Sequence, residues 1–196
     1  MKIAARTLGL LLPLALSAPA WAATAAEIID VSQIQSGGNG CPGGGPLEVY
    51  QSSFSGRVMI FLPEMNVDVS SKRIDRKACA ISLAVAMPAG KRLVIGEPAV
   101  FGAADLAEGA SAIAAAEVFT AGSTGPKVDS KIGAKTDEHV EYYYDRVEDV
   151  VRTECGADVN VRANVSLLGN KGSSAQGGSA TLEGTALTLQ LEDCGQ

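Results

Sequence analysis

The sequence has little of what catalysis and metal binding commonly require. Its 196 residues include one histidine, His139, and one tryptophan, Trp21, and aromatic residues make up only 5%. Any catalytic triad or histidine-based metal site would therefore have to use His139. The chain has no C-x-x-C pair, which argues against an all-thiolate zinc site, and no G-x-S-x-G element of the serine hydrolases. We expect no cofactor.

Long apolar runs are also missing, apart from a short one at the N-terminus. A basic start precedes the apolar residues 8–16, and Ala-Trp-Ala at 20–22 gives a small-x-small pattern. This arrangement is typical of a bacterial secretory signal peptide, so we expect residues 1–22 to be cleaved off. Residues 23–196 then form a single secreted domain, periplasmic or extracellular. No later stretch is long enough to span a membrane as a helix.

Acidic residues outnumber basic ones by 22 to 16, and the formal net charge is −6. An acidic domain is a poor partner for nucleic acid or an anionic membrane surface. Basic residues gather within 57–92 and acidic ones within 137–158. Two solvated faces explain this pattern most simply, but opposed patches would favour an unknown protein partner or weak self-association. The basic residues that would mediate self-association are Lys72, Arg73, Arg76 and Lys77.

Four cysteines in an exported chain predict two disulfides. Three pairings of Cys41, Cys79, Cys155 and Cys194 are possible. We favour Cys41 with Cys79 and Cys155 with Cys194, because each pair joins segments that we expect to be neighbours. Each bridge would close a loop of about 40 residues and stabilise the oxidised protein by roughly 3 to 4 kcal/mol.

The stretch 76–101 predicts the central strands. Cys79, Ile81, Leu83, Val85 and Met87 alternate with small residues, so the odd-numbered side chains face a core. The even-numbered face is small rather than polar, which predicts an internal strand that is covered on both sides or closely approached by a neighbour. A Pro-Ala-Gly turn at 88–90 then leads into a second strand, and we expect the two to form a hairpin.

Other segments also carry strand signals. Residues 47–53 and 57–62 predict a second hairpin, and 159–167 alternate apolar and polar side chains most regularly. We expect 122–135 and 169–179 to be loops because they are rich in Gly and Ser. Further strands are expected within 28–31, 67–69, 110–114, 117–121, 136–154 and 185–191. The pattern predicts an all-β fold, an antiparallel two-sheet β-sandwich of about 8–10 short strands, with a closed β-barrel as the alternative.

Two short motifs match known patterns without their structural context. Gly38, Gly40 and Gly43 spell G-x-G-x-x-G, but Cys41-Pro42 interrupts the pattern and no helix follows, so we expect a turn around a disulfide. Asn164-Val165-Ser166 is formally a glycosylation sequon, and we interpret Asn164 as an outward polar residue of a strand.

A cation site is the one candidate for metal chemistry. On a strand, Asp137, His139, Glu141 and Asp145 would share one face and could present carboxylates and an imidazole to a divalent ion. The alternative is an ordinary solvated face opposite Val140, Tyr142 and Tyr144. No catalytic residue can be named, because a carboxylate-dependent hydrolase needs only two acids and the chain has many.

An ordered set of motifs resembles one protein family. Gly38-Asn39-Gly40-Cys41-Pro42, Arg76-Lys77-Ala78-Cys79, Met87-Pro88-Ala89-Gly90, a segment from Gly102 to Gly109 and Cys155-Gly156 are similar to the domain-of-unknown-function family 4360. The resemblance implies an exported β-rich domain without assigned activity. The chain departs from the family pattern before Cys155, where Thr153-Glu154 replaces a tryptophan-containing segment. We therefore expect a non-catalytic binding or envelope-associated module that recognises a protein or a glycan. The alternative is a secreted carboxylate-dependent hydrolase of polysaccharide or peptide.

Overall fold

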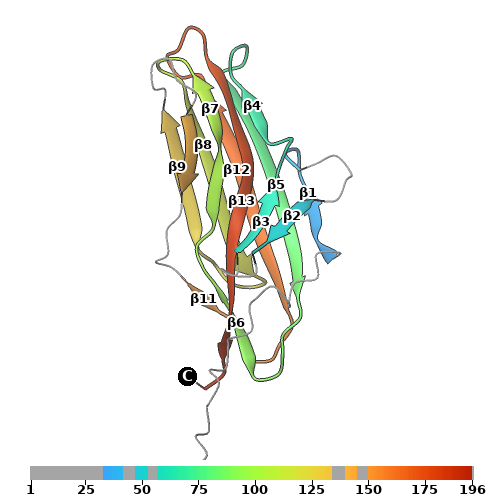
Figure 1. Ribbon diagram of the computed structural model, residues 1–196. Coiled ribbons are helices and arrows are strands. Elements are labelled where there is room, and N and C mark those ends of the chain that lie inside the picture. Colours follow the sequence, from blue (N-terminus) through green and yellow to red (C-terminus); the bar gives the residue numbers. More distant parts are fainter. Residues whose placement is uncertain (1–32, 42–46, 53–56, 134–139, 145–149, 196) are drawn as a thin grey trace, which may run out of the picture.

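The computed structural model of the chain describes residues 33–41, 47–52, 57–133, 140–144 and 150–195, and of 140–144 only the backbone. Two antiparallel sheets make up these residues, and the sheets do not join into a closed barrel (Figure 1). The predicted β-sandwich is confirmed, and the barrel alternative is wrong. The described residues form thirteen strands rather than about 8–10, since short strands also form in the connecting segments. No helix among them is long and apolar enough to cross a membrane.

The first sheet has five strands in the order β1-β5-β12-β8-β9. Its longest members, β5 and β12, pair along their entire lengths from Ile74 opposite Asn170 to Val85 opposite Val159. Strand β5 is internal, as predicted. The bounds are β1 Gln35–Gly37, β5 Ile74–Val85, β12 Val159–Asn170, β8 Ser111–Thr120 and β9 Lys127–Gly133.

The second sheet has eight strands, and the last strand of the chain organises it. Strand β13 pairs with β7, β3, β4 and β6, so all the other strands of this sheet reach it directly or through one neighbour. The bounds are β2 Glu48–Gln51, β3 Arg57–Phe61, β4 Asn66–Asp68, β6 Lys91–Ile95, β7 Ala99–Leu106, β10 Val140–Tyr144, β11 Val151–Arg152 and β13 Gly178–Asp193. The predicted hairpin of β2 with β3 is confirmed.

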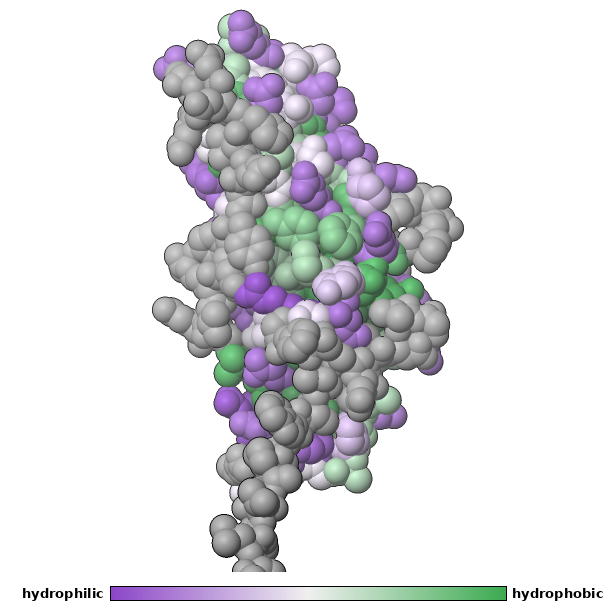
Figure 2. Space-filling model, in the orientation of Figure 1, coloured by the Kyte–Doolittle hydropathy of each residue, from purple (hydrophilic) through white to green (hydrophobic). Residues whose placement is uncertain are grey.

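The core lies between the two sheets and follows the predicted alternation. On β5, Cys79, Ile81, Leu83 and Val85 are all at most 2% exposed. The matching inward face of β12 consists of small and medium apolar residues, and β13 contributes Leu182, Leu187 and Leu189. The outer surface is mixed: Figure 2 shows a group of apolar residues in the middle of one face, with polar residues around it.

The connection between β5 and β6 shows that the predicted central hairpin is wrong. Gly90 has a φ of 74° and the Lys91 amide donates to the Pro88 carbonyl, so a turn forms where it was predicted. The two strands nevertheless belong to different sheets, because β5 pairs with β1 and β12 whereas β6 pairs with β11 and β13. The turn residues indicate only that the chain reverses, and not which sheet receives β6.

Two further predictions about the middle of the chain are wrong. Residues 110–114 and 117–121 form one strand, β8, instead of two, and its even-numbered side chains are buried from Ala112 to Val118. The predicted loop 122–135 contains β9, which pairs with β8 and buries Val128 and Ile132. Pairing of the whole of β9 with residues 111–117 of β8 provides the backbone hydrogen bonds that keep this Gly-, Ser- and Lys-containing segment extended.

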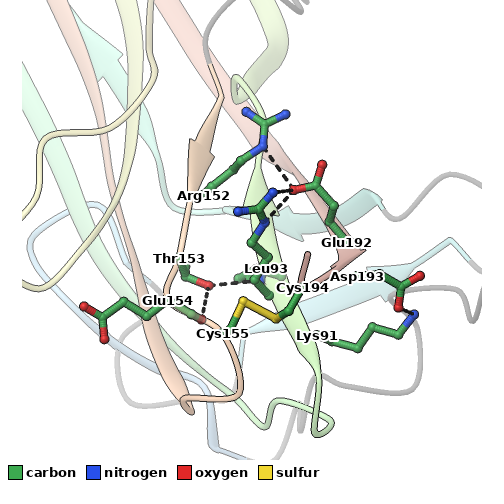
Figure 3. The surroundings of a disulfide bond; sticks show 10 residues. Lys91, Leu93, Arg152, Thr153, Glu154, Cys155, Glu192, Asp193 and Cys194 are labelled. Atoms are coloured by element: carbon green, nitrogen blue, oxygen red, sulfur yellow. Dashed lines mark hydrogen bonds and ion pairs between the residues drawn. A yellow bond between two sulfur atoms is a disulfide. The ribbon is translucent and has the colours of Figure 1, made fainter. Parts of the chain in front are cut away.

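Both predicted disulfides are confirmed. Cys41 is bonded to Cys79, and Cys155 is bonded to Cys194. The second bridge ties the turn after β11 to the end of β13 (Figure 3), where Arg92 and Arg152 both donate to the Glu192 carboxylate. The hydrogen bond from Arg92 and the one from Arg152 lower the pKa of Glu192. Disulfides form in oxidising compartments, which indicates an extracytoplasmic location.

We expect the two disulfides to differ in their resistance to reduction. Cys41 and Cys79 are 6% and 1% exposed, whereas Cys155 is exposed and Cys194 is half-buried. Because a thiolate must reach a sulfur atom to attack it, Cys155–Cys194 should be reduced at least about tenfold faster under native conditions. Mild dithiothreitol treatment, alkylation and peptide mass spectrometry will measure both rates. Equal labelling of the two pairs would contradict this difference in access.

A turn at Gly38 packs directly against β5 beside the buried disulfide. The Gly40 amide donates to the Ala78 carbonyl, and the Cys41 amide donates to the Gly38 carbonyl. The interpretation of the G-x-G-x-x-G pattern as a turn therefore holds for Gly38 and Gly40, while Gly43 lies outside the described residues.

Gly38→Ala should lower the free energy of unfolding by about 2 kcal/mol. Gly38 has a φ of 138°, and a Cβ there would lie 2.3 Å from the Ala78 carbonyl oxygen. Urea denaturation of the oxidised protein measures the effect. The neighbouring Gly37→Ala is the control, because its Cβ would meet nothing within 4 Å. Equal losses for the two variants would show that this close approach is unimportant.

Candidate functional site

The outer face of the five-stranded sheet is hollowed along β5 and β12. A hollow of about 600 Å³ lies over the first half of β5, where Ala78, Ala80, Ala115 and Ser166 form part of its lining. These small residues are adjacent across three strands, since Ser166 lies opposite both Ala78 and Ala115. The larger side chains of Arg76, Glu117, Lys127, Asp129 and Leu168 also line this hollow.

Two more hollows continue the first one along the same strands. A hollow of about 380 Å³ shares Ala80 and Asn164 with the first and adds Ser82 and Arg162. A hollow of about 400 Å³ follows around Ala84 and Asn160. We call the three together the trough. Residues 76–86 span roughly 33 Å at the usual rise of a strand, so the trough is long.

The trough corrects the prediction that both faces of β5 are covered. Ala80 and Ala86 are exposed, and Ala78, Ser82 and Ala84 are half-buried. The even-numbered side chains are therefore small on a face that the described part of the chain leaves partly exposed. Strand β1 approaches β5 from the side, with Gly37 opposite Ala80, and this part of the prediction is confirmed.

Charges in the trough balance. The three basic residues are Arg76, Lys127 and Arg162, and the three acidic residues are Glu117, Asp129 and Asp158. The Lys127 ammonium lies 2.8 Å from the Asp129 carboxylate, and this hydrogen bond raises the pKa of Lys127. The uncharged polar residues are four amides and three hydroxyls, namely Gln33, Gln35, Asn160, Asn164, Ser36, Ser82 and Ser166.

Several polar groups around the trough are held in place by the fold. The Ser82 hydroxyl donates to the Asn160 side-chain oxygen at 2.7 Å, and the Asp158 carboxylate accepts from the Met87 amide at 2.9 Å. At the other end, the Asn39 side chain accepts from the Ala78 amide and donates to the Arg76 carbonyl. These hydrogen bonds hold polar groups of the trough in place, and none of them involves the outward side-chain amide of Asn164.

A second exposed feature lies on the outer face of the eight-stranded sheet. The Phe61 and Phe101 rings meet edge to face with centroids 5.9 Å apart. Tyr50 on β2 is 61% exposed, and it faces the same way because it lies opposite Met59, two residues from Phe61. This group is an apolar patch on the outer face of the sheet.

The predicted cation site falls largely outside the described residues. Asp137, His139 and Asp145 are not described, and Glu141 lies on β10, of which only the backbone is described. Within the described part of the chain, no three acidic, histidine or cysteine side chains converge on a position that could hold a metal ion.

Three residues of the predicted basic patch have different surroundings. Arg76 lines the trough, whereas the Lys77 ammonium donates to the Asn39 carbonyl and Lys72 pairs with Asp75. Much of the acidic stretch that would oppose the patch lies outside the described residues. Asn164, the outward residue of the sequon, is exposed in the trough as predicted.

The sequence predicted the outward side chains of both strands that form the trough, but not that these strands are neighbours. The small face of β5 and the polar face of β12 were each visible as alternations. What remained hidden was that these two strands pair, with β8 on the far side of β12. Small side chains on neighbouring strands create a hollow only once the strand order is known.

Comparison with known proteins gives a family and two distant structures. Residues 27–194 match the family described as Domain of unknown function (DUF4360). No curated protein sequence matches the chain. A structure of TmCBM61 in complex with beta-1,4-galactotriose is 13% identical with a TM-score of 0.28, covering 84% of this chain and 90% of that one.

The second structure is the enzymatically active domain of tailspike protein 4 of bacteriophage CBA120. It is 9% identical with a TM-score of 0.22, covering 83% of this chain and 20% of that one. This chain thus spans about a fifth of the tailspike structure. Both TM-scores are too low for either structure to bear on the function of this chain.

Proposed function

This chain belongs to the DUF4360 family, a domain of unknown function, and from its own geometry we propose that it is an exported, non-catalytic binding module. Its ligand is an extended polymer chain that lies in the trough. The observation that carries the proposal is the alignment of three hollows along one pair of strands. Binding sites are usually concave surfaces with a few positioned polar groups, and a long one suits a linear ligand.

The fold supports a rigid binding face. Strands β5, β12 and β8 form the floor of the trough, and their ladders place side chains from distant parts of the sequence in fixed register. Sites on strands are positioned more precisely than sites on loops. The signal peptide and two disulfides suit a protein that works outside the cytoplasm, in the periplasm or the medium.

Filling the trough should abolish binding. Ala115→Phe places a ring beside Ser166, so any polymer that the wild-type protein retains should lose about tenfold or more in affinity. Affinity electrophoresis through gels containing a neutral glucan, a polyuronate or an unfolded polypeptide measures the loss. Ala175→Phe is the control, because Ala175 is exposed in the loop after β12 and does not line the trough. Equal binding by both variants would place the ligand elsewhere.

Two carboxylates favour a second candidate function, a secreted hydrolase of polysaccharide or peptide. Glu117 and Asp129 line the same hollow on neighbouring strands, and glycosidases use such pairs. Lys127 and Asp129 are 54% and 53% exposed, however, which suits an open binding surface better than a site that holds one acid protonated. Release of reducing ends or amines from a bound polymer, lost in Glu117→Gln, would support the hydrolase over the module.

A further inference from the structure

The chemistry of the trough narrows the class of polymer. Three bases and three acids line it, so its formal charge is zero, although the whole chain carries −6. A surface that binds a polyanion gathers cations, and one that binds a polycation gathers anions. Neither kind of charge dominates here.

Uncharged polar groups outnumber the groups of either charge. Amides and hydroxyls each donate and accept hydrogen bonds, as the hydroxyl groups of a sugar do. Carboxylates such as Glu117 accept from hydroxyls, and Arg162 donates to them. Phe119 lies opposite Arg162 in the register and lines the middle hollow, so it adds an aromatic ring to the apolar side chains, such as Ile113 and Leu168, that also line the trough.

The position of the trough disfavours a polypeptide ligand. An extended peptide gains most of its affinity by pairing its backbone with a free strand edge. The trough lies on the face of the sheet, where β12 pairs with both β5 and β8, and β5 pairs with β12 along its whole length and with β1 at residues 80–82. A ligand in the trough therefore meets side chains only, and a chain that carries hydroxyls along its length matches them best.

We propose that the trough binds a linear, uncharged glycan. This inference rests on the proposed function and adds the ligand class. The glycan runs along β5 and β12, with its hydroxyls hydrogen-bonded to the amides of residues such as Asn164 and Gln35, and with one sugar face against the Phe119 ring. Since the trough has no net charge, binding depends little on ionic strength.

Introducing opposite charges at one position tests the ligand class. Ala80 is exposed at the junction of two hollows, so Ala80→Arg and Ala80→Glu both narrow the trough but add opposite charges. Ala175→Arg and Ala175→Glu are the matched controls in an exposed loop. The probes are an array of neutral linear glycans, a polyuronate, polylysine and carboxymethylated casein, applied to the oxidised protein.

For an uncharged glycan, both Ala80 variants should weaken binding by about tenfold or more, and both controls should leave it unchanged. Affinity should also stay constant within about twofold as salt rises from roughly 50 to 500 mM, because only charge-dependent binding is screened. If a charged polymer binds instead, with Ala80→Arg and Ala80→Glu acting in opposite directions, the ligand class is wrong while the trough remains a polymer site. Preferential binding of casein would likewise show that the ligand class is wrong, while the trough remains a polymer site. If no probe binds, both the ligand class and the proposed function fail.

Discussion

Replacing both Cys41 and Cys79 by alanine will lower the free energy of unfolding by about 3 to 5 kcal/mol, measured by urea denaturation. The bridge closes a loop across a sequence separation of 38, and loop-closure entropy alone accounts for roughly 4 kcal/mol. Both cysteines also belong to the core, so alanine leaves unfilled space around the middle of β5. The turn at Gly38 would lose its covalent attachment to the edge of the trough.

The other disulfide provides a matched control. Cys155 and Cys194 have a sequence separation of 39, so the entropic contribution of their bridge is the same. Their surroundings differ, because Cys155 is exposed and the nearby ion pairs of Glu192 still join β6, β11 and β13. We therefore expect the Cys155/Cys194 double alanine variant to lose less stability. A larger loss at this exposed bridge would mean that burial does not decide the difference.

Alternation made β5 and β12 predictable, and composition concealed β8 and β9. On β12, Val161, Val165 and Leu167 contrast clearly with the polar residues between them. On β8, alanines occupy both faces from Ala112 to Ala116, so one face cannot be told from the other by hydropathy. Strand β9 is held by pairing with β8, and its own residues resemble those of a loop.

Disulfide pairing was predictable because it depends on neighbours in chain order, whereas sheet membership was not. Strands β5 and β6 are joined by the five residues 86–90, yet they lie in different sheets. Nothing in Pro88-Ala89-Gly90 distinguishes a hairpin from a crossing between layers. The trough escaped prediction for the same reason, since it depends on which distant strands become neighbours.

Two adjacent leucines on β12 test the assignment of its faces. Leu167 is 0% exposed between the sheets, while Leu168 points outward, half-buried, into the trough. Leu167→Ala removes core contacts and leaves a cavity, so the free energy of unfolding should fall by about 3 to 5 kcal/mol. Leu168→Ala should cost about 1 kcal/mol or less, because its side chain is partly in water already. Urea denaturation of both variants gives the comparison directly.

The two substitutions remove the same atoms from neighbouring residues of one strand, so intrinsic strand propensity cancels between them. Side chains alternate with a period of two, and a shift of one residue in the pairing of β12 would exchange the two positions. The same shift would turn Asn164 and Ser166 into the core and Val165 out into the trough. A greater loss at Leu168 than at Leu167 would therefore overturn both the register of the five-stranded sheet and the binding surface built on it.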